Sequence, residues 1–455
     1  MSRKRDAGTL AVIIALAWPT MLEQLMQTTV QYIDTAMVGA LGTQAMAAVG
    51  ATATVNWLVN STVSALGVGF LSYIAQAIGA KDPDRARRAS GQAVMTVLVV
   101  GTLLTLLTTG LSGLVPVWMR VDAGIRQTAS RYFLILYTPM LFRSASILFG
   151  TVLRAAGDTK TPMRAGLIVN AINIVLNFFL IYSPRAVSIG EHSLFIPGAG
   201  WGVLGAAVAS AAAYTVGGII ISVMFWKHPV ISPRGQSLRP DPWILRPWFR
   251  VALPNMLQRF ATSFGYVVFA SMINSLGDVS TAAHTIANTV ESAFYIPGWG
   301  MQTAAATLAG NAWGARDEKK LRSLAGTVLP LEVGMMLVSG GLLFLFAPQL
   351  MRLFSRDTEV IALGAAVLRM VAVSEPFYGV PIVLEGIMQG VGKTVAPFIY
   401  NTLGMWGVRI VGTWLCTQRL GFGLVSAWGC MIGHNMLLFI LFTVHYLTGR
   451  WDPGR

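Results

Sequence analysis

The polar residues of the first apolar stretch are the ones best suited to chemistry. Glu23, Gln27, Gln31 and Asp34 follow one another at intervals of four, four and three residues, so an α-helix would place all four on one face. Polar side chains are costly within a membrane and are functional candidates there. Asp34 is expected in the outer half of the bilayer, where loss of water disfavours an ionised carboxylate. We interpret Asp34 as a switchable proton site, although an Asp held by amides for purely structural reasons would show the same pattern.

A second polar face lies in the fifth apolar stretch. Asn170, Asn173 and Asn177 are spaced i, i+3 and i+7, which again places them on one side of a helix. An amide can donate to a carboxylate or accept from a carboxylic acid, so these side chains suit a site that changes protonation. Hydrogen bonds that only hold helices together are the alternative explanation.

Other residues are weaker candidates for a substrate cavity. Methionine and aromatic side chains form adaptable apolar walls, and a few polar groups orient the ligand. Two buried acids of the second half are further candidates. The sequence does not show which groups form ion pairs with the arginines at 143, 259, 369 and 409. The predicted cavity residues are Gln27, Gln31, Tyr32, Met37, Asn170, Glu291 and Glu375.

The elements that carry these residues must be membrane-spanning helices. The chain has 455 residues, of which 54% are hydrophobic and 11% are charged, and its mean hydropathy is +0.62. Its apolar runs are continuous rather than alternating, which favours helices over a barrel. Twelve spans are predicted: 8–39, 44–78, 90–117, 127–153, 161–183, 201–226, 246–275, 280–309, 323–347, 361–389, 396–417 and 423–447.

Basic residues are concentrated on one side of these spans. One set of segment ends carries 22 of the 33 Lys and Arg residues. This bias predicts that both termini lie in the cytoplasm, with the chain in a bacterial inner membrane. The net charge of +14 is therefore explained by orientation signals and contacts with lipid headgroups, and no nucleic-acid partner is expected.

The two halves of the chain align at one constant offset in residue number, which is the interval from Pro19 to Pro254. At the same offset, Gly79-Ala80-Lys81-Asp82 matches Gly314-Ala315-Arg316-Asp317. The repeat predicts two lobes, residues 1–227 and 246–455, joined by a cytoplasmic loop at 228–245. Because six spans is an even number, the pseudo-two-fold axis between the two six-helix bundles should run along the membrane normal. Such lobes can rock about a central cavity, as a transporter requires.

Several kinds of function lack their signatures. Gly67-Val68-Gly69 has no following Gly-Lys-Ser/Thr, so it is not a nucleotide loop. Cys416, Cys430 and five scattered histidines form no metal-ligand pattern, and we expect neither a cofactor nor a metal. The sequence also lacks a His/Asp cluster of the kind that would indicate an intramembrane enzyme. We expect a monomeric transporter and not an enzyme.

Three motifs resemble those of the multidrug and toxic compound extrusion (MATE) family. They are the stretch from Ile33 to Gly42, the turn Leu153–Thr159 and its twin Met388–Thr394. The resemblance covers nearly the whole chain and is strongest to the DinF-like branch. It implies twelve helices in two lobes and export of amphipathic or cationic drugs by antiport with H⁺ or Na⁺. A flippase for a lipid or lipid-linked precursor is the alternative, because related two-lobe proteins move lipids.

The resemblance also assigns roles to individual residues. Asp34 matches the coupling carboxylate, Pro19 the bend point of the first span and Asn173 a member of the polar cluster. Ser210 matches a hydroxyl of the sixth span. Asn177 stands where the branch often has Asp, so the site has lost one carboxyl. This departure favours H⁺ over Na⁺ as the coupling ion.

Overall fold

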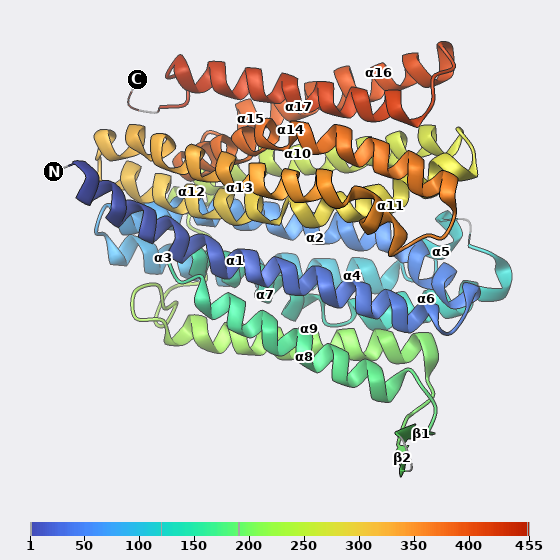
Figure 1. Ribbon diagram of the computed structural model, residues 1–455. Coiled ribbons are helices and arrows are strands. Elements are labelled where there is room, and N and C mark those ends of the chain that lie inside the picture. Colours follow the sequence, from blue (N-terminus) through green and yellow to red (C-terminus); the bar gives the residue numbers. More distant parts are fainter. Residues whose placement is uncertain (1, 120, 190–191, 453, 455) are drawn as a thin grey trace. The chain divides into compact units, whose positions relative to one another are not determined.

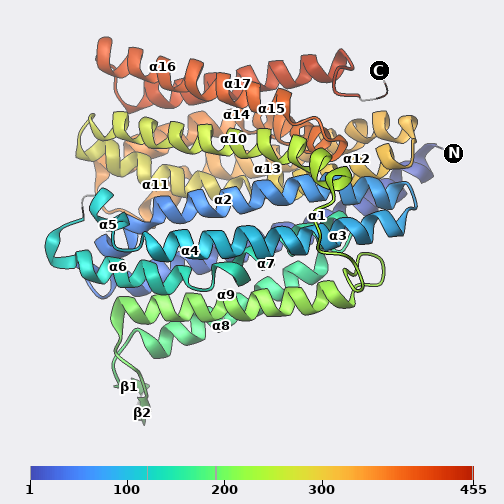
Figure 2. The same ribbon diagram turned by 180° about the vertical axis from the view of Figure 1, so that it is seen from behind.

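The protein folds almost entirely into helices (Figures 1 and 2). The structure is a computed structural model that describes residues 2–119, 121–189, 192–452 and 454. The first half contains α1 (Ser2–Gly39), α2 (Thr43–Gly79), α3 (Pro83–Thr96), the π-helical η1 (Val97–Gly101), α4 (Thr102–Gly110), α5 (Val115–Trp118), α6 (Ala123–Tyr137), α7 (Met140–Ala155), α8 (Lys160–Leu180) and α9 (Gly202–Lys227). The second half contains α10 (Pro242–Asn274), α11 (Asp278–Phe294), α12 (Ile296–Gly314), α13 (Glu318–Arg352), α14 (Thr358–Val391), α15 (Val395–Thr402), η2 (Leu403–Ile410), α16 (Val411–Thr413), η3 (Trp414–Arg419) and α17 (Leu424–Leu447).

Each of the twelve predicted spans coincides with one helix or with a run of consecutive helical segments. Among the described residues, eight helices are long and apolar enough to cross a membrane by themselves, and α6 with α7 makes a ninth, bent by 49°. The bend falls next to Pro139, whose ring cannot continue the helix. The other predicted spans are not among these nine. The span of α10 contains arginines, the span of α11 and α12 has a break at Tyr295, and the span from α15 to η3 contains π-helical turns. The prediction of an all-helical membrane protein is confirmed.

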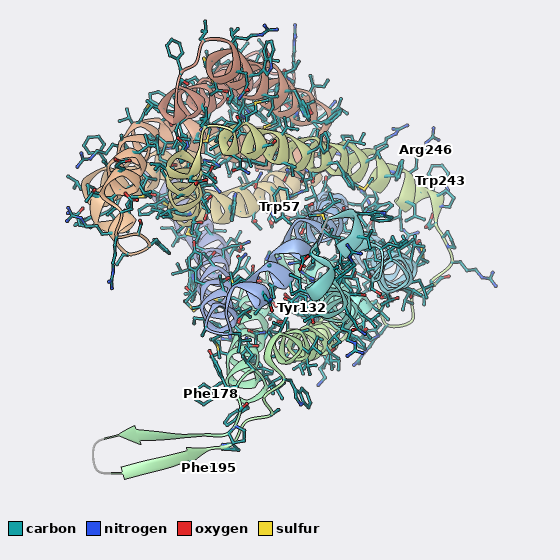
Figure 3. The ribbon with its side chains drawn as sticks, turned by 90° about the vertical axis from the view of Figure 1, so that its right-hand side faces the viewer. Trp57, Tyr132, Phe178, Phe195, Trp243 and Arg246 are labelled. Carbon is teal, nitrogen blue, oxygen red and sulfur yellow. The ribbon has the colours of Figure 1, made fainter. Side chains whose placement is uncertain are left out.

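A small antiparallel hairpin was not predicted. Strand β1 (Arg185–Ile189) pairs with β2 (His192–Ile196) between α8 and α9. Figure 3 shows it extending away from the helices, with Phe195 labelled on it and Phe178 near its base. Because the hairpin is inserted in the first half only, α9 and α17 do not keep the register of the repeat.

The internal repeat is visible in the backbone. Positive φ is uncommon for residues other than glycine, since Cβ clashes with the backbone there. Lys81 and Arg316 nevertheless have φ of 57° and 55°, and they occupy equivalent positions of the repeat. Two glycine pairs with the same separation in residue number also have similar φ: Gly42 and Gly277 (109° and 101°), and Gly157 and Gly392 (84° and 87°). The duplication therefore repeats turn conformation as well as sequence.

The helices group into two compact units. Unit 1 comprises Met1–Met21, Val68–Asp82 and Arg246–Arg455, and unit 2 comprises Leu22–Gly67 and Pro83–Leu245. Unit 2 ends at Leu245, so it includes residues 228–245. Unit 1 also includes the first part of α1, where Ile13 and Ala17 join an apolar cluster of α12 to α14. The lobes at 1–227 and 246–455 remain a proposal about how the duplicated halves act.

Within unit 1, α2 and α12 cross at a pair of glycines. A Cβ on Gly79 would lie 2.0 Å from the carbonyl oxygen of Asn311, and a Cβ on Gly314 would lie 1.9 Å from that of Gln76. Gln76 and Asn311 are themselves equivalent positions of the repeat, so the two contacts are copies of one another. Small residues allow such close backbone approach in membranes. The crossing is thus made by the duplicated Gly-Ala-Lys/Arg-Asp segments.

Candidate functional site

Asp34 lies in a cluster of polar side chains from α1, α8 and α9, all within unit 2. Asn177 Nδ2 donates to Asp34 Oδ1 at 2.6 Å and to Asn173 Oδ1 at 3.1 Å. Asn173 Nδ2 donates in turn to Ser210 Oγ at 3.1 Å. Asn173 and Asn177 are buried, and Asp34 is half-buried. The helical spacing of each stretch therefore brings Asp34, Asn173, Asn177 and Ser210 together, and we call these four residues the Asp34 cluster.

The cluster offers a second hydrogen-bond arrangement. If the Asn173 amide is turned over, its Nδ2 donates to Asp34 Oδ1 at 2.8 Å and to Oδ2 at 3.2 Å, and its Oδ1 accepts from Ser210 Oγ at 3.1 Å. The hydroxyl of Ser210 can donate or accept, so it satisfies either amide orientation. Asn177 Oδ1 is buried and has no hydrogen-bond partner among the described residues. It is therefore available to accept a hydrogen bond from a neutral Asp34 when that amide turns.

An aromatic and cationic group lies beside the Asp34 cluster. The Arg143 guanidinium stands 4.5 Å from the ring centroid of Tyr214 and 6.0 Å from that of Tyr137. Tyr132, labelled among the helices of unit 2 in Figure 3, interacts electrostatically with both Asp34 and Arg143. Arg143 is buried, and its Nη1 has no hydrogen-bond partner in the part of the chain that the structure describes. Unit 2 therefore contains a buried cation that cation–π contacts stabilise.

The residues predicted to line a cavity lie in different environments. Gln27, Gln31 and Tyr32 are exposed on α1, and Met37 is partly buried, with its carbonyl accepting from the Tyr182 hydroxyl at 3.1 Å. Asn170 shares the face of Asn173, but its buried Nδ2 has no hydrogen-bond partner within residues 2–119, 121–189, 192–452 and 454. The polar stripe of α1 is thus partly accessible, whereas Asn170 lies apart from the hydrogen bonds of the Asp34 cluster.

The two acids predicted in the second half are buried in unit 1. Glu291 on α11 is 2% exposed and accepts a hydrogen bond from the Tyr295 hydroxyl, and Glu375 on α14 is fully buried. Glu375 interacts electrostatically with Glu291 and with Glu332 of α13, which the sequence did not single out. No carboxyl oxygen of Glu332 or Glu375 has a hydrogen-bond partner among the described residues. Neither predicted acid presents a surface to a ligand in this conformation.

Two pairs of equivalent positions make different polar contacts in the two halves. In unit 2, Arg154 Nη2 and Glu23 Oε2 form an ion pair at 2.6 Å. The equivalent positions of the second half hold Gln258 and Gln389, and both amides donate to Glu385 Oε1 at 2.9 Å. The first half therefore has an ion pair where the second half has a carboxyl held by amides. Spacing alone could not find this, because the partners come from helices that are distant in sequence.

The Glu23–Arg154 ion pair should contribute strongly to stability. Its side chains are only 10% and 17% exposed. Replacing Arg154 with Gln leaves a nearly buried, unpaired Glu23, and we expect a loss of about 3 kcal/mol in the free energy of unfolding. Replacing both with Gln, the residue type found at both second-half positions, should restore most of that loss. Thermal unfolding of the two single variants and the double variant in detergent measures this, and additive losses would show that the pair is not coupled.

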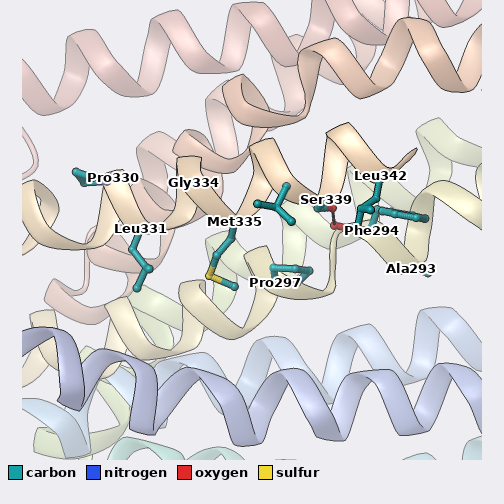
Figure 4. Close-up of a pocket in the computed structure, with 10 residues that line it drawn as sticks. Ala293, Phe294, Pro297, Pro330, Leu331, Gly334, Met335, Ser339 and Leu342 are labelled. Atoms are coloured by element: carbon teal, nitrogen blue, oxygen red, sulfur yellow. Dashed lines mark hydrogen bonds between the residues drawn. The ribbon is translucent and has the colours of Figure 1, made fainter. Parts of the chain in front are cut away.

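An apolar groove of about 570 Å³ opens on unit 1 between α13 and the break that separates α11 from α12 (Figure 4). Its ten lining residues are all uncharged. The hydroxyl of Ser339 is already used, since it donates to the carbonyl of Phe294 at 2.9 Å. The groove therefore offers apolar contact but no polar anchor. Among the described residues, no group of three or more His, Cys, Asp or Glu side chains could hold a metal ion.

Comparison with known proteins agrees with the duplicated architecture. The MatE family model matches residues 19–179 and again residues 254–415, so the two matches begin at the offset of the repeat. The chain is 27% identical over 441 residues to the probable multidrug resistance protein NorM of Thermotoga maritima, covering 97% of this chain and 92% of the relative. It is 26% identical over 458 residues to the probable multidrug resistance protein YpnP of Bacillus subtilis, with 98% and 96% covered. A crystal structure of MATE in complex with MaD3S has a TM-score of 0.87 at 23% identity and covers 97% and 95% of the two chains.

Proposed function

The chain belongs to the MatE family, and on this premise we propose that it exports amphipathic and cationic drugs across the inner membrane in exchange for H⁺. The observation that carries the proposal is the Asp34 cluster, in which one carboxyl faces groups that can either donate or accept hydrogen bonds. The equivalent second-half residue of Asp34 is Phe269, so this carboxyl belongs to one half alone. The names of the two relatives, both probable multidrug resistance proteins, support the substrate class.

The exchange follows from the two protonation states of Asp34. An ionised Asp34 accepts from the amides of Asn177 and Asn173 and contributes a negative charge that favours a bound cationic drug. A proton arriving from outside removes that charge, and Asn177 Oδ1 then accepts from the neutral carboxyl. Drug binding and proton binding thus oppose each other through a single side chain, and this coupling is reciprocal.

The ligands available at the cluster favour H⁺ over Na⁺ as the coupling ion. A hard cation needs several oxygen ligands, preferably with negative charge. Here Asp34 is the single carboxylate of the cluster, and the other three residues can offer only neutral amide or hydroxyl oxygens. A proton needs only the carboxyl itself and one acceptor for its hydrogen bond.

Pro19 is positioned to serve as the bend point of α1. It lies inside the helix, two residues before Met21, the last α1 residue that belongs to unit 1. Proline lacks the N–H that an unbroken helix uses, so the helix bends there at lower cost. We propose that protonation of Asp34 alters the bend of α1 as the two lobes rock, with both termini on the cytoplasmic side.

Transport in proteoliposomes tests the proposal. Purified protein is reconstituted with a fluorescent cationic drug, and a proton gradient, a sodium gradient or no gradient is imposed. Drug movement that follows the proton gradient and is lost with a protonophore supports H⁺-coupled export. If only labelled lipid crosses the bilayer, the protein is a flippase and the proposal is wrong.

Restoring a second carboxylate should change the coupling ion. Asn177→Asp would place a carboxylate where Nδ2 now stands 2.6 Å from Asp34 Oδ1. Two carboxylates so close cannot both stay ionised unless they share a proton or a cation. We expect export driven by a sodium gradient to rise by about fivefold or more. Asn170→Asp adds the same charge to the same helix outside the cluster and serves as the control; a sodium response shared by both variants, or absent from both, would contradict the assignment.

A further inference from the structure

A polar pocket lies at the C-terminal end of α9, the helix that also carries Ser210 of the Asp34 cluster. It has a volume of about 260 Å³ and is lined by Arg87, Trp226, Lys227, His228, Ser232 and Arg234. All six residues belong to unit 2. The helix that leads to it is a candidate membrane span from Gly202 to Lys227. The pocket therefore lies at the end of a candidate span, where lipid headgroups are expected to meet water.

Hydrogen bonds fix the backbone of this pocket before any ligand enters. Ser232 Oγ donates to the carbonyl of Trp226 at 2.7 Å and accepts from the backbone N–H of Arg234 at 3.4 Å. The Arg87 guanidinium donates to the carbonyls of Pro229 and Val230 at 3.1 and 3.3 Å. A guanidinium has five N–H donors, so those not bound to these carbonyls remain for a ligand. The turn after α9 is thus held to α3 by Arg87 without using up its charge.

His228 adds a donor whose tautomer the structure determines. Its Nδ1 accepts from the backbone N–H groups of Val230 and Ile231 at 3.2 and 3.3 Å. The hydrogen of a neutral imidazole must then be on Nε2. Burial lowers the pKa of His228 below its ordinary value, and the nearby Asp158 carboxylate acts in the opposite direction. The neutral ring keeps one N–H to donate at physiological pH.

The charge balance of the pocket favours an anion. Arg87, Lys227 and Arg234 are three cations in one small cavity, and Asp158 is the acid that faces His228. The last carbonyls of α9 carry partial negative charge, but Phe225 and Trp226 already have hydrogen-bond donors on theirs. Guanidinium groups match the oxygens of phosphate in geometry and form strong charge-assisted hydrogen bonds with them.

We propose that this pocket binds a phosphate group, supplied either by an anionic lipid headgroup or by free inorganic phosphate. Arg87, Lys227 and Arg234 provide the charge, and His228 Nε2 provides a directional donor. The Trp226 ring lies at the membrane interface, where such amphipathic side chains are favoured. The site is separate from the transported drug and does not depend on which ion drives export.

Native mass spectrometry of the purified protein with phosphatidylglycerol and phosphatidylcholine tests the lipid source. We expect preferential retention of phosphatidylglycerol, reduced by about tenfold in Lys227→Gln/Arg234→Gln because two charge-assisted contacts are lost. Arg246→Gln/Arg250→Gln is the matched control, since it removes the same charge from exposed positions outside the pocket. Arg234→Gln alone keeps the backbone hydrogen bond to Ser232 and tests the site if the double variant does not fold.

Calorimetry with inorganic phosphate, on protein stripped of lipid, tests the other source. Phosphate binding that the pocket variant loses and the control variant keeps supports a site for free phosphate. Selective retention of phosphatidylglycerol without phosphate binding supports the lipid headgroup. Equal effects of the pocket and control variants, or equal retention of the two lipids together with no phosphate binding, would overturn the proposal.

Discussion

Replacing Asp34 with Asn should abolish proton-driven export while leaving the protein folded. Asn has nearly the same shape and can still donate and accept hydrogen bonds with Asn177 and Asn173, but it cannot change its charge. Drug and proton then no longer exchange through this side chain. We expect the gradient-driven rate in proteoliposomes to fall by about 100-fold, near the upper end of the range for coupling between two sites.

A matched control separates this loss from a general effect of removing an acid. Asp84 is an exposed residue in the first turn of α3, outside the Asp34 cluster. Asp84→Asn makes the same chemical change and should transport at the wild-type rate. If Asp34→Asn kept more than half of the wild-type rate under a proton gradient, Asp34 would not be the coupling group.

Adding a methyl group at the crossing of α2 and α12 should have the largest effect on stability. A Cβ at Gly79 or Gly314 would lie only 2.0 or 1.9 Å from a backbone carbonyl oxygen, and backbone cannot move aside as a flexible side chain can. We expect Gly79→Ala and Gly314→Ala each to cost about 3 kcal/mol or more in the free energy of unfolding. Because the two contacts are copies, the two losses should be similar in size.

The control for these variants is another helical glycine of unit 1. A Cβ at Gly326 in α13 meets no atom within 4 Å, and alanine favours a helix over glycine. Gly326→Ala should therefore unfold at the wild-type temperature or slightly above it. Thermal unfolding in detergent, followed by size-exclusion chromatography, compares the three variants. Wild-type stability for Gly314→Ala would mean that the helices do not cross as closely as described.

Helical periodicity and the duplication were enough to predict much of the fold and the centre of the site. Asp34 and Asn177 are 143 residues apart in sequence and form a hydrogen bond, yet each was identified from its own polar face. The constant offset of the repeat predicted that Lys81 and Arg316 are equivalent, and their shared positive φ agrees. Both successes depend on regularities that repeat along the chain.

The remaining features depend on which helices become neighbours, which periodicity does not specify. Glu23 was assigned to the polar stripe of α1, but its partner Arg154 is determined by the packing of α7 beside α1. Glu332 lies in the apolar part of α13, and only the fold brings it near Glu375. The hairpin after α8 forms from a short segment between two spans, where backbone pairing outweighs any apolar pattern.

The differences between the halves are more informative about function than the repeat itself. The duplicated residues Gly79 and Gly314 make two copies of the same packing contact between α2 and α12. Asp34 and Asn177 have Phe269 and Gly412 at the equivalent positions. The first half has thus kept a carboxyl that the second half lacks, and we propose that this carboxyl exchanges a proton. The buried acids of unit 1, Glu291 and Glu375, have a different setting and require separate tests.

Proton release on drug binding shows directly whether Asp34 couples drug to proton. Purified protein in weakly buffered detergent is mixed with a cationic drug at a pH where Asp34 is still protonated, and the released protons are measured with a pH indicator. We expect release of up to about one proton per protein molecule, falling as the starting pH rises, and no release from Asp34→Asn. Equal proton release from the wild type and from Asp34→Asn would show that Asp34 is not the coupling group.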